Sequence, residues 1–362
     1  MWNSSILQNS KQNKTGERLK PASLFLFFFL FIGILGALPN QALFISKIFI
    51  TQWFLAGMVI CFYLKNIWLR SFLFWITLRI ALKYSSLDNL ALLTFFSIIL
   101  ACLFYQFIKD KIQKKDFLDI ICIIALVQVF WIYLQIFKID PLFKVNPLYK
   151  DFVNLNAGFM GNTNLSGILL AICLPAFFRK RWCWCLPVFI YPLFKINCFT
   201  AIMALGIGIA YFILRKSKDS AVCIIMLTLL LLSGWHKIAG YNPRFDLWER
   251  LIPIIKTHPF VGWGIGQYRF IASPIISKKL VSSLNGTCAH NDLLQLWIDA
   301  GLVAVVIAIG FIVWLFVKYS KNDIQLTTIV LVRIISSLGF FTFYTPVAFL
   351  ILGAMARMEK GG

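Results

Sequence analysis

The sequence predicts an all-α polytopic integral membrane protein with about 12 transmembrane helices. Hydrophobic residues make up 60% of the 362-residue chain, charged residues make up only 14%, and the mean hydropathy is +0.81. About a quarter of the residues in a soluble domain are charged, so this chain has too little polar surface for a soluble fold. Runs such as Leu24 to Leu38 contain no charge and approach bilayer length. Helices satisfy their backbone polar groups within each span, which makes them the expected element.

Each predicted span is an apolar run bounded by polar or basic residues. The spans are 22–39, 46–64, 69–84, 88–108, 116–137, 163–178, 182–197, 199–214, 221–235, 291–317, 323–341 and 345–356. With a cytoplasmic tail at 1–21, the alternation of sides places the basic clusters at 109–115, 179–181 and 215–218 in the cytoplasm. Because basic residues favour cytoplasmic loops, this agreement predicts a bacterial inner-membrane protein with both termini cytoplasmic. The whole chain, 1–362, is interpreted as a single membrane domain.

The net charge of +21 does not indicate a nucleic-acid-binding protein. The basic residues lie in short clusters between apolar spans, and no known nucleic-acid-binding motif is present. The cysteines lie mostly inside apolar spans, where they behave as small hydrophobic residues. Cys183 and Cys185 have no second pair with metal-ligand spacing, so no metal site is predicted.

Two connections are predicted to be extracytoplasmic. The first, 138–162, ends in GFMGNTN, and the second, 236–290, is the longest loop in the chain. Within the second loop, residues 244–259 have helical spacing of apolar side chains, which predicts an amphipathic helix on the membrane surface. The residues expected on its apolar face are Phe245, Trp248, Leu251, Ile252 and Ile255. Long loops in compact folds are usually functional.

The second loop ends in His290, Asn291 and Asp292, at the start of a predicted span. Asn291 or Asp292 is available to cap that helix, and free N–H groups at a helix start favour anions. A histidine near arginines is suited to bind phosphate or to accept a hydroxyl proton. The alternative is that these groups only anchor the loop at lipid headgroups. The nearby segment 262–270, GWGIGQYRF, follows no strand and so is not a dinucleotide fingerprint; its glycines predict tight turns near a ligand or a neighbouring helix.

These motifs together resemble the O-antigen ligase and polymerase superfamily. The resemblance rests on RFDLWERLIPIIKTHPFVGWGIGQYRF, on AHNDLLQLWIDAGLVAVVIAIG and on GFMGNTNLSGILLAICLPAFF, and covers roughly 155–310. It implies a glycosyltransferase that takes a glycan from polyprenyl diphosphate at the periplasmic face and transfers it to a hydroxyl of lipid A core, another glycan or a related acceptor. It also implies an inverting reaction without cofactor, metal or nucleic acid.

The resemblance implies a set of site residues. His290 would act as the base or acceptor-positioning group and Arg244 would contact the diphosphate, both as catalytic residues. Substrate-binding residues would be Arg250, Arg269, Lys195, Asn162, Asn164 and Asn291.

The sequence departs from the family pattern at one point. Many members carry a Ser-Arg pair where this chain has Phe199 or its neighbours, and Lys195 stands one turn away as a substitute cation. This favours a diverged polymerase or unusual transferase over a standard ligase.

Two other classes of protein stay open. The first is a transporter or flippase of lipid-linked saccharide, which should place ionisable groups near the middle of the bilayer. Few ionisable residues fall inside predicted spans: Lys47, Arg79, Lys83 and Arg333, with Asp299 and Lys195 near span ends. Most other charge outside the cytoplasmic clusters is external. The second is a structural subunit of an envelope complex, which would not need Arg244 and His290 to face one cavity.

Overall fold

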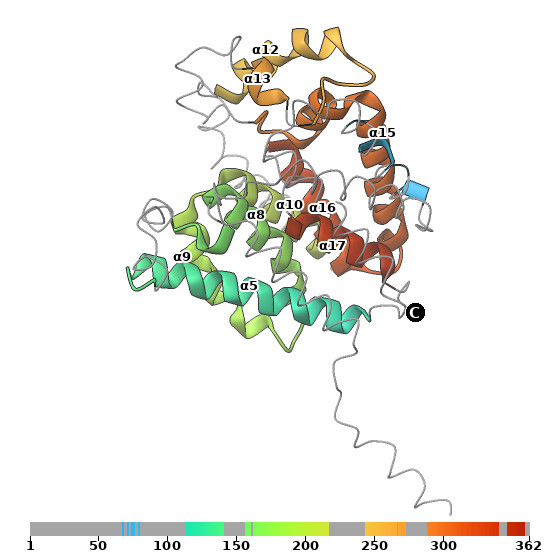
Figure 1. The fold of residues 1–362 in the computed structure, drawn as a ribbon. Helices are drawn as coiled ribbons and strands as arrows, with labels where there is room; N and C mark the ends of the chain where they lie inside the picture. The colour runs from blue at the N-terminus through green and yellow to red at the C-terminus, as the bar shows by residue number, and fades with distance from the viewer. Residues whose placement is uncertain are drawn as a thin grey trace, which may run out of the picture.

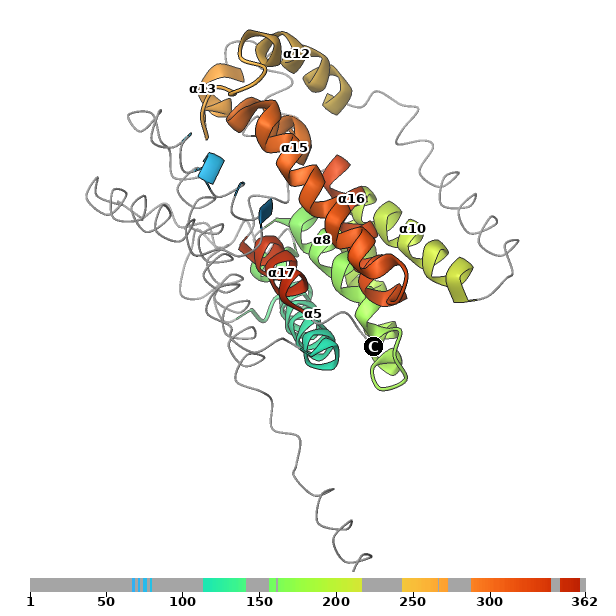
Figure 2. The same ribbon diagram turned by 90° about the vertical axis from the view of Figure 1, so that its right-hand side faces the viewer.

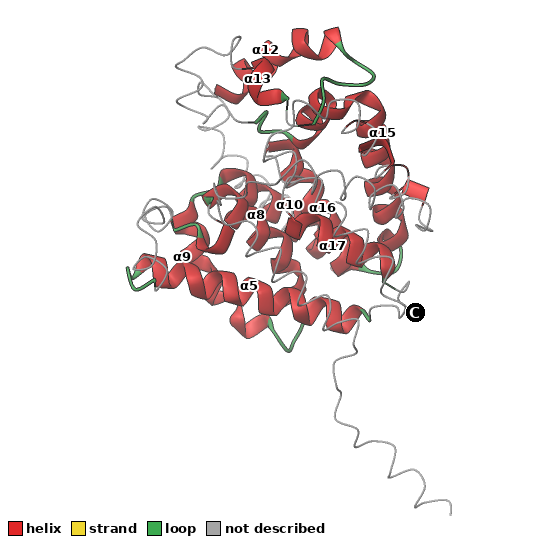
Figure 3. Ribbon diagram, viewed as in Figure 1, coloured by secondary structure: helices red, strands yellow, loops and turns green. Residues whose placement is uncertain are grey.

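The described part of the computed structural model is helical throughout (Figure 3). The structure describes residues 67–68, 71, 74–76, 79, 113–140, 156–160, 162–216, 243–265, 267–272, 288–339 and 346–358. The α-helices are α5 (Lys114–Ile136), α8 (Thr163–Cys173), α9 (Pro187–Ile196), α10 (Phe199–Lys216), α12 (Pro243–Thr257), α13 (Tyr268–Ala272), α15 (Asp292–Ser320), α16 (Ile324–Gly339) and α17 (Pro346–Arg357). Short 3-10 helices are η3 (Gly158–Met160), η4 (Leu174–Phe177) and η5 (Cys183–Cys185).

The predicted spans that fall on described residues coincide with helices to within a few residues. Helix α5, helix α8 with η4, and helices α9, α10, α15, α16 and α17 occupy seven of these spans. Residues 67–68, 71, 74–76 and 79 are helical, as expected for much of the span 69–84. Helices α5, α10 and α15 are each long and apolar enough to cross a membrane. The spans 22–39, 46–64, 88–108 and 221–235, and the tail 1–21, lie outside the described residues.

Small side chains allow the central helices to approach one another. Helix α10 packs most extensively against α16, and α15 also packs along α16. A Cβ added to Gly208 of α10 would press on Val332 and lie 3.3 Å from the Thr328 methyl carbon of α16. Such close approach of small residues is how membrane helices gain packing contacts where no hydrophobic effect acts between them.

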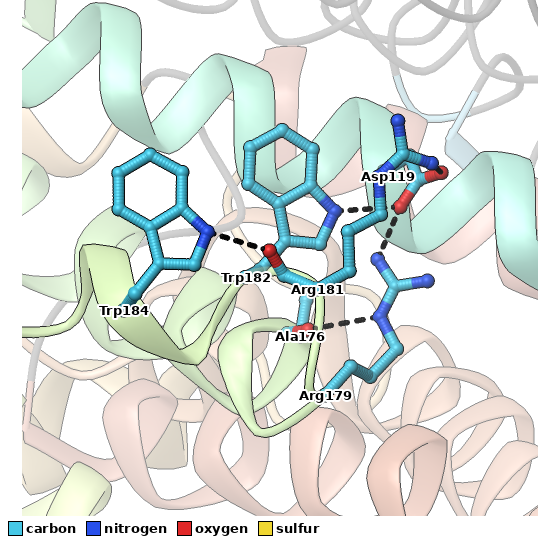
Figure 4. Close-up of polar contacts among 6 residues, drawn as sticks. All are labelled: Asp119, Ala176, Arg179, Arg181, Trp182 and Trp184. Atoms are coloured by element: carbon cyan, nitrogen blue, oxygen red, sulfur yellow. Dashed lines mark hydrogen bonds and ion pairs between the residues drawn. The ribbon is translucent and has the colours of Figure 1, made fainter.

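Ion pairs at one end of the bundle involve three loops that are predicted to be cytoplasmic: 109–115, 179–181 and the turn between α15 and α16. Asp119 of α5 accepts hydrogen bonds from the guanidinium groups of Arg179 and Arg181 and from the Trp182 indole (Figure 4). The Lys114 ammonium lies 2.7 Å from the carboxylate of Asp323, at the turn between α15 and α16. We refer to this end as the basic end.

Helices α12 and α13 lie at the opposite end, beside the outer end of α15 (Figures 1 and 2). Helix α12 covers most of the residues predicted to form an amphipathic helix, and protein covers only part of the predicted apolar face. Leu251 and Ile255 are buried, whereas Phe245 and Ile252 are exposed. Leu247 and Ile254 are buried instead, because α12 packs against α13, Ala289 and Ile298 on that side. The helix therefore has one apolar face covered by protein and a neighbouring apolar edge left exposed.

Candidate functional site

Arg244 joins α12 to the ends of two other helices. Its Nη1 atom donates to the Gly339 carbonyl oxygen at 2.8 Å and lies 3.4 Å from Oγ1 of Thr200. Gly339 ends α16 and Thr200 lies at the start of α10. The side chain is half-buried, and burial lowers the pKa of its guanidinium below the ordinary value. Because a guanidinium group keeps its proton far above neutral pH, Arg244 remains a cation.

His290 and Asn291 lie at the same end of α16. Asn291 is the N-cap of α15, since its Oδ1 accepts from the N–H groups of Leu293 and Leu294 at 2.9 and 3.1 Å. Its Nδ2 donates to the carbonyl oxygen of Leu338 at 2.9 Å. Because Leu338 directly precedes Gly339, Asn291 and Arg244 bind consecutive carbonyls. The structure thus brings Arg244 close to Asn291, the residue that directly follows His290.

The backbone at His290 is held in an unusual conformation. His290 is 8% exposed and has a φ of 51°. This angle lies in the left-handed region of backbone conformation, which residues other than glycine rarely adopt. Such a conformation persists when surrounding contacts impose it, and it is often found at functional sites.

Ala289 directly precedes His290, and side chains bind both its N–H group and its carbonyl oxygen. Its carbonyl oxygen accepts from the Trp248 indole at 2.8 Å, and its N–H donates to the Gln295 amide oxygen at 2.7 Å. Gln295 in turn donates to Asp299 at 2.9 Å. The Arg-x-x-x-Trp spacing places Arg244 and Trp248 one turn apart, so that Trp248 is bonded to the residue before His290 and Arg244 to the end of α16. Sequence reasoning missed Gln295 and Asp299, whose spacing of four residues in an apolar helix was the available signal.

Asp292, the first residue of α15, pairs with Arg333 of α16. The oxygen and nitrogen atoms are 3.2 Å apart, and the two side chains are 0% and 3% exposed. The sequence identified Arg333 as an ionisable residue inside a span, but its partner could not be inferred from sequence spacing.

The glycine-rich segment after α12 packs on a break in α15. Gly301 has a φ of 80° and a ψ of 176°, which interrupts the helix. A Cβ on Gly262 (φ 66°) would lie 2.6 Å from the Gly301 nitrogen, so the contact requires glycine. The glycines therefore form a tight turn against a neighbouring helix, one of the two alternatives predicted for them.

Asn162 and Asn164 lie at the start of α8. Asn162 is its N-cap and accepts from the N–H groups of Asn164 and Leu165 at 2.9 and 3.2 Å. The Cys198 thiol donates to the Asn164 carbonyl oxygen at 3.7 Å, and Cys198 lies two residues before Thr200, which Arg244 contacts. The start of α8 therefore adjoins the same region as Arg244.

Gln128 of α5 holds the segment that precedes α8. Its amide nitrogen donates to the Ala157 carbonyl oxygen at 3.2 Å, and its amide oxygen accepts from the Phe159 N–H at 3.1 Å. Sequence reasoning did not identify this support.

Two other predicted substrate-binding residues make local contacts. The Lys195 ammonium lies 5.6 Å from the centre of the Tyr191 ring, and Arg250 forms a 3.0 Å ion pair with Asp246. Each partner is four residues earlier in the same helix, so these contacts do not link the two side chains to Arg244 or His290. Arg269 belongs to α13, and its side chain lies outside the described set.

Residues 155–309 match the family model described as O-Antigen ligase. The predicted resemblance is confirmed. The matched segment contains every predicted site residue, whereas Arg79, Arg333 and Gly339 lie outside it. Together with the apolar helices, the match indicates a bacterial membrane protein.

A protein of Haemophilus influenzae described as uncharacterized is 28% identical to this chain over 121 residues. The alignment covers 32% of this chain and 30% of that relative, so the chain spans less than a third of the relative's length. Within the described residues no three His, Cys, Asp or Glu side chains gather as a possible metal site.

Proposed function

We propose that this protein is a membrane glycosyltransferase of the O-antigen ligase or polymerase type. It takes a glycan carried on polyprenyl diphosphate and transfers it to an acceptor hydroxyl at the periplasmic face of the inner membrane. The family match to residues 155–309 supports the reaction class. The observation that carries the assignment of roles is that Arg244 and Asn291 bind the consecutive carbonyls of Gly339 and Leu338. These bonds place Arg244 near Asn291, the residue after His290, and this supports a shared site for the cation and the histidine.

Arg244 is proposed to stabilise the departing diphosphate. In the transfer, the bond between the anomeric carbon and the phosphate oxygen breaks, and its electron pair leaves with the diphosphate. A guanidinium group meets phosphate oxygens through paired N–H donors and stabilises the charge that develops there. Half-burial strengthens such an interaction, because the local dielectric constant is lower than that of water. The Ser-Arg pair of many family members is missing near Phe199, so Arg244 is the cation to which this proposal assigns the diphosphate.

His290 is proposed to accept the proton of the acceptor hydroxyl. As the acceptor oxygen bonds to the anomeric carbon, its proton passes to the imidazole. Attack opposite the departing diphosphate inverts the configuration at that carbon. The Trp248 and Gln295 side chains hold the backbone of Ala289, and the cap at Asn291 holds the residue after His290. The histidine backbone is therefore fixed before substrate binds, which favours efficient proton transfer.

The other predicted substrate-binding residues remain part of the proposal in two groups. Asn162, Asn164 and Asn291 lie at helix starts, where backbone N–H groups favour anionic or hydroxyl-rich ligands. Lys195, Arg250 and Arg269 are basic residues proposed to contact the outer parts of the donor or acceptor. We expect substitutions in either group to raise KM more than they lower kcat.

The proposed periplasmic orientation rests on the separation of charge. The basic end holds Asp119 and its arginines, whereas Arg244 and His290 lie at the opposite end of the bundle. Because basic clusters favour the cytoplasm, the opposite end should face the periplasm. A flippase of the same lipid carrier is the rival function, and its ionisable groups should line a path through the bilayer. The Asp292–Arg333 pair instead lies beside the start of α15.

The test is transfer in vitro with purified, folded variants. Arg244→Ala should abolish most activity, and Arg244→Lys should recover part of it because charge is kept and the paired donors are lost. His290→Gln should lower turnover by about 10²- to 10⁴-fold. Matched controls are Lys256→Ala, an exposed cation of α12, and His258→Gln, an exposed histidine after it. Near wild-type turnover in His290→Gln would exclude His290 as the general base.

The second test uses a deletion strain and its surface glycans. Loss of long chains from lipid A with accumulation of lipid-linked polymer indicates a ligase, and products limited to a single repeat unit indicate a polymerase. An unchanged glycan profile would contradict the proposed function. Movement of lipid-linked saccharide across vesicles, without transfer, would support the flippase instead.

A further inference from the structure

The break at Gly301 divides α15 into an outer half, residues 292–300, and an inner half, residues 302–320. A helix end leaves backbone groups without partners inside the helix, and in a membrane protein they need other partners. The carbonyl oxygens of Ile298 and Asp299 accept from the N–H groups of Trp263 and Gly264 at 2.7 and 3.0 Å. The glycine-rich segment after α12 therefore covers the end of the outer half.

The last carbonyl of the outer half has a partner from a different part of the chain. The indole of Trp75 donates to the Ala300 carbonyl oxygen at 2.6 Å. One turn along the same helical region, the Nη2 atom of Arg79 donates to the Gly262 carbonyl oxygen at 2.8 Å. Both residues lie in the predicted span 69–84, outside the matched segment 155–309.

Arg79 is a buried cation without a carboxylate partner among the described residues. Its side chain is 5% exposed, and none of the described acidic residues forms an ion pair with it. Its Nε atom is buried and has no hydrogen-bond partner among the described residues. A buried charge in this state is destabilising unless something nearby compensates it. An ionisable side chain within a span is also a candidate for a functional role.

The end of the outer half supplies that compensation. The C-terminal end of a helix carries a partial negative charge, and a cation placed there is stabilised. Gly262 lies directly on this end, since an added Cβ would be 2.7 Å from the Ile298 carbonyl oxygen and 2.8 Å from the Ala300 nitrogen. Arg79, bound to the Gly262 carbonyl, therefore lies beside the negative end of the outer half. Its position is explained without a carboxylate partner.

We propose that Trp75 and Arg79 are positioning residues for the reaction centre, acting through the break at Gly301. They fix one end of the outer half, and the other end carries Asn291 and His290. The outer half is a short rigid rod of about 13 Å, so a shift at the break moves His290 relative to Arg244. A misplacement of about 1 Å at a reaction centre costs on the order of 10²-fold in rate. This inference rests on the proposed function for its effect on turnover.

The experiment compares Arg79→Gln, Arg79→Lys and Trp75→Phe with Trp68→Phe as the matched control. Trp68 belongs to the same helical region but lies against Gly310 in the inner half. Arg79→Gln keeps N–H donors and loses the charge, so it should lower kcat by about tenfold to a hundredfold with little change in KM. Arg79→Lys should recover much of the loss because it keeps the cation. Trp68→Phe should leave kcat unchanged.

Hydrogen exchange provides a reading that does not depend on transfer activity. Arg79→Gln and Trp75→Phe should speed amide exchange in residues 259–264 and 298–302, and leave residues 200–216 unchanged. Unchanged exchange in these segments, or equal kcat in wild type and Arg79→Gln, would overturn the inference. If Arg79→Gln does not fold, Trp75→Phe decides by the same criteria. Wild-type protein without transfer activity contradicts the proposed function alone, because exchange still tests the link between the two residues and the break.

Discussion

The buried Asp292–Arg333 pair should matter to stability far more when one partner is removed than when both are neutralised. Arg333→Met removes the cation and leaves the Asp292 carboxylate, whose side chain is 0% exposed, without its ion-pair partner. The double variant Asp292→Asn with Arg333→Met leaves neither charge. The comparison therefore separates the penalty of an unpaired buried charge from the net contribution of the pair.

The expected changes in the free energy of unfolding follow from the burial of the Asp292–Arg333 pair. Breaking a buried pair by removing one partner typically costs about 3–5 kcal/mol, and replacing the whole pair by uncharged groups is often close to neutral. Asp292 also lies in the first turn of α15, where a negative charge contributes about 0.3–1 kcal/mol. We therefore expect the double variant to be less stable than wild type by about 1 kcal/mol. It should be more stable than Arg333→Met by about 2–4 kcal/mol.

The assay is unfolding of the purified protein by a denaturing detergent, followed by loss of helical signal. The control is the exposed Arg250–Asp246 pair of α12, whose side chains are 43% and 30% exposed. Removing Arg250 should cost about 0.3–0.5 kcal/mol, since exposed pairs four residues apart on a helix contribute little. A double variant as unstable as Arg333→Met would show that the uncompensated carboxylate is not the cause, and would refute this reasoning.

Three further predictions test other parts of the structure. Gly262→Ala should destabilise the protein by about 3 kcal/mol in the same detergent assay. An alanine in the left-handed conformation is strained, and the hydrogen bonds from Trp263 and Gly264 to α15 are lost. A neutral result would contradict the packing at the break. Burial raises the pKa of the Tyr268 hydroxyl, with Cys288 and Asp299 adding to the effect, above its ordinary value of 10.0. The folded protein then keeps this proton where the unfolded chain releases it, so stability should fall as pH rises past 10.0, and Tyr268→Phe should lessen that fall in unfolding measured against pH. Reporter fusions after Lys114 and Lys216 should read cytoplasmic and one after Lys278 periplasmic, and a cytoplasmic reading at Lys278 would remove the site from the compartment of its proposed substrate.

Hydropathy and charge were sufficient to locate seven of the described helices, because a span must be long, apolar and bounded by polar residues. Helix α13 was not predicted. The cap at Asn291 and the amphipathic helix α12 could also be predicted, since both have short-range signals. The buried face of α12 was less predictable. Leu247 and Ile254 are buried because α13 and the start of α15 cover them, and that contact is not encoded in the spacing within α12.

The parts of the site that sequence reasoning missed depend on contacts across long separations. Gln128 binds residues about 30 positions later, Arg333 of α16 pairs with Asp292 of α15 over 41 positions, and Arg79 reaches Gly262 over 183 positions. The break at Gly301 was also missed, and 291–317 was predicted as one continuous span. A single glycine within an apolar run gives no sign of a break. Only the packing of Gly262 against it makes the conformation necessary.

The break at Gly301 also determines the depth of the candidate site in the bilayer. The inner half of α15 is about 28 Å long and α16 is about 24 Å long. The two helices are joined by the short turn at residues 321–323, where α15 ends and α16 begins. Their far ends therefore lie at nearly the same level, one membrane thickness from that turn. Asn291 is bonded to Leu338 at the far end of α16, so the outer half lies across the end of the bundle instead of extending away from it. If the proposed function is right, this arrangement holds Arg244 and His290 at the level of the lipid headgroups, where a donor anchored by a polyprenyl chain is presented.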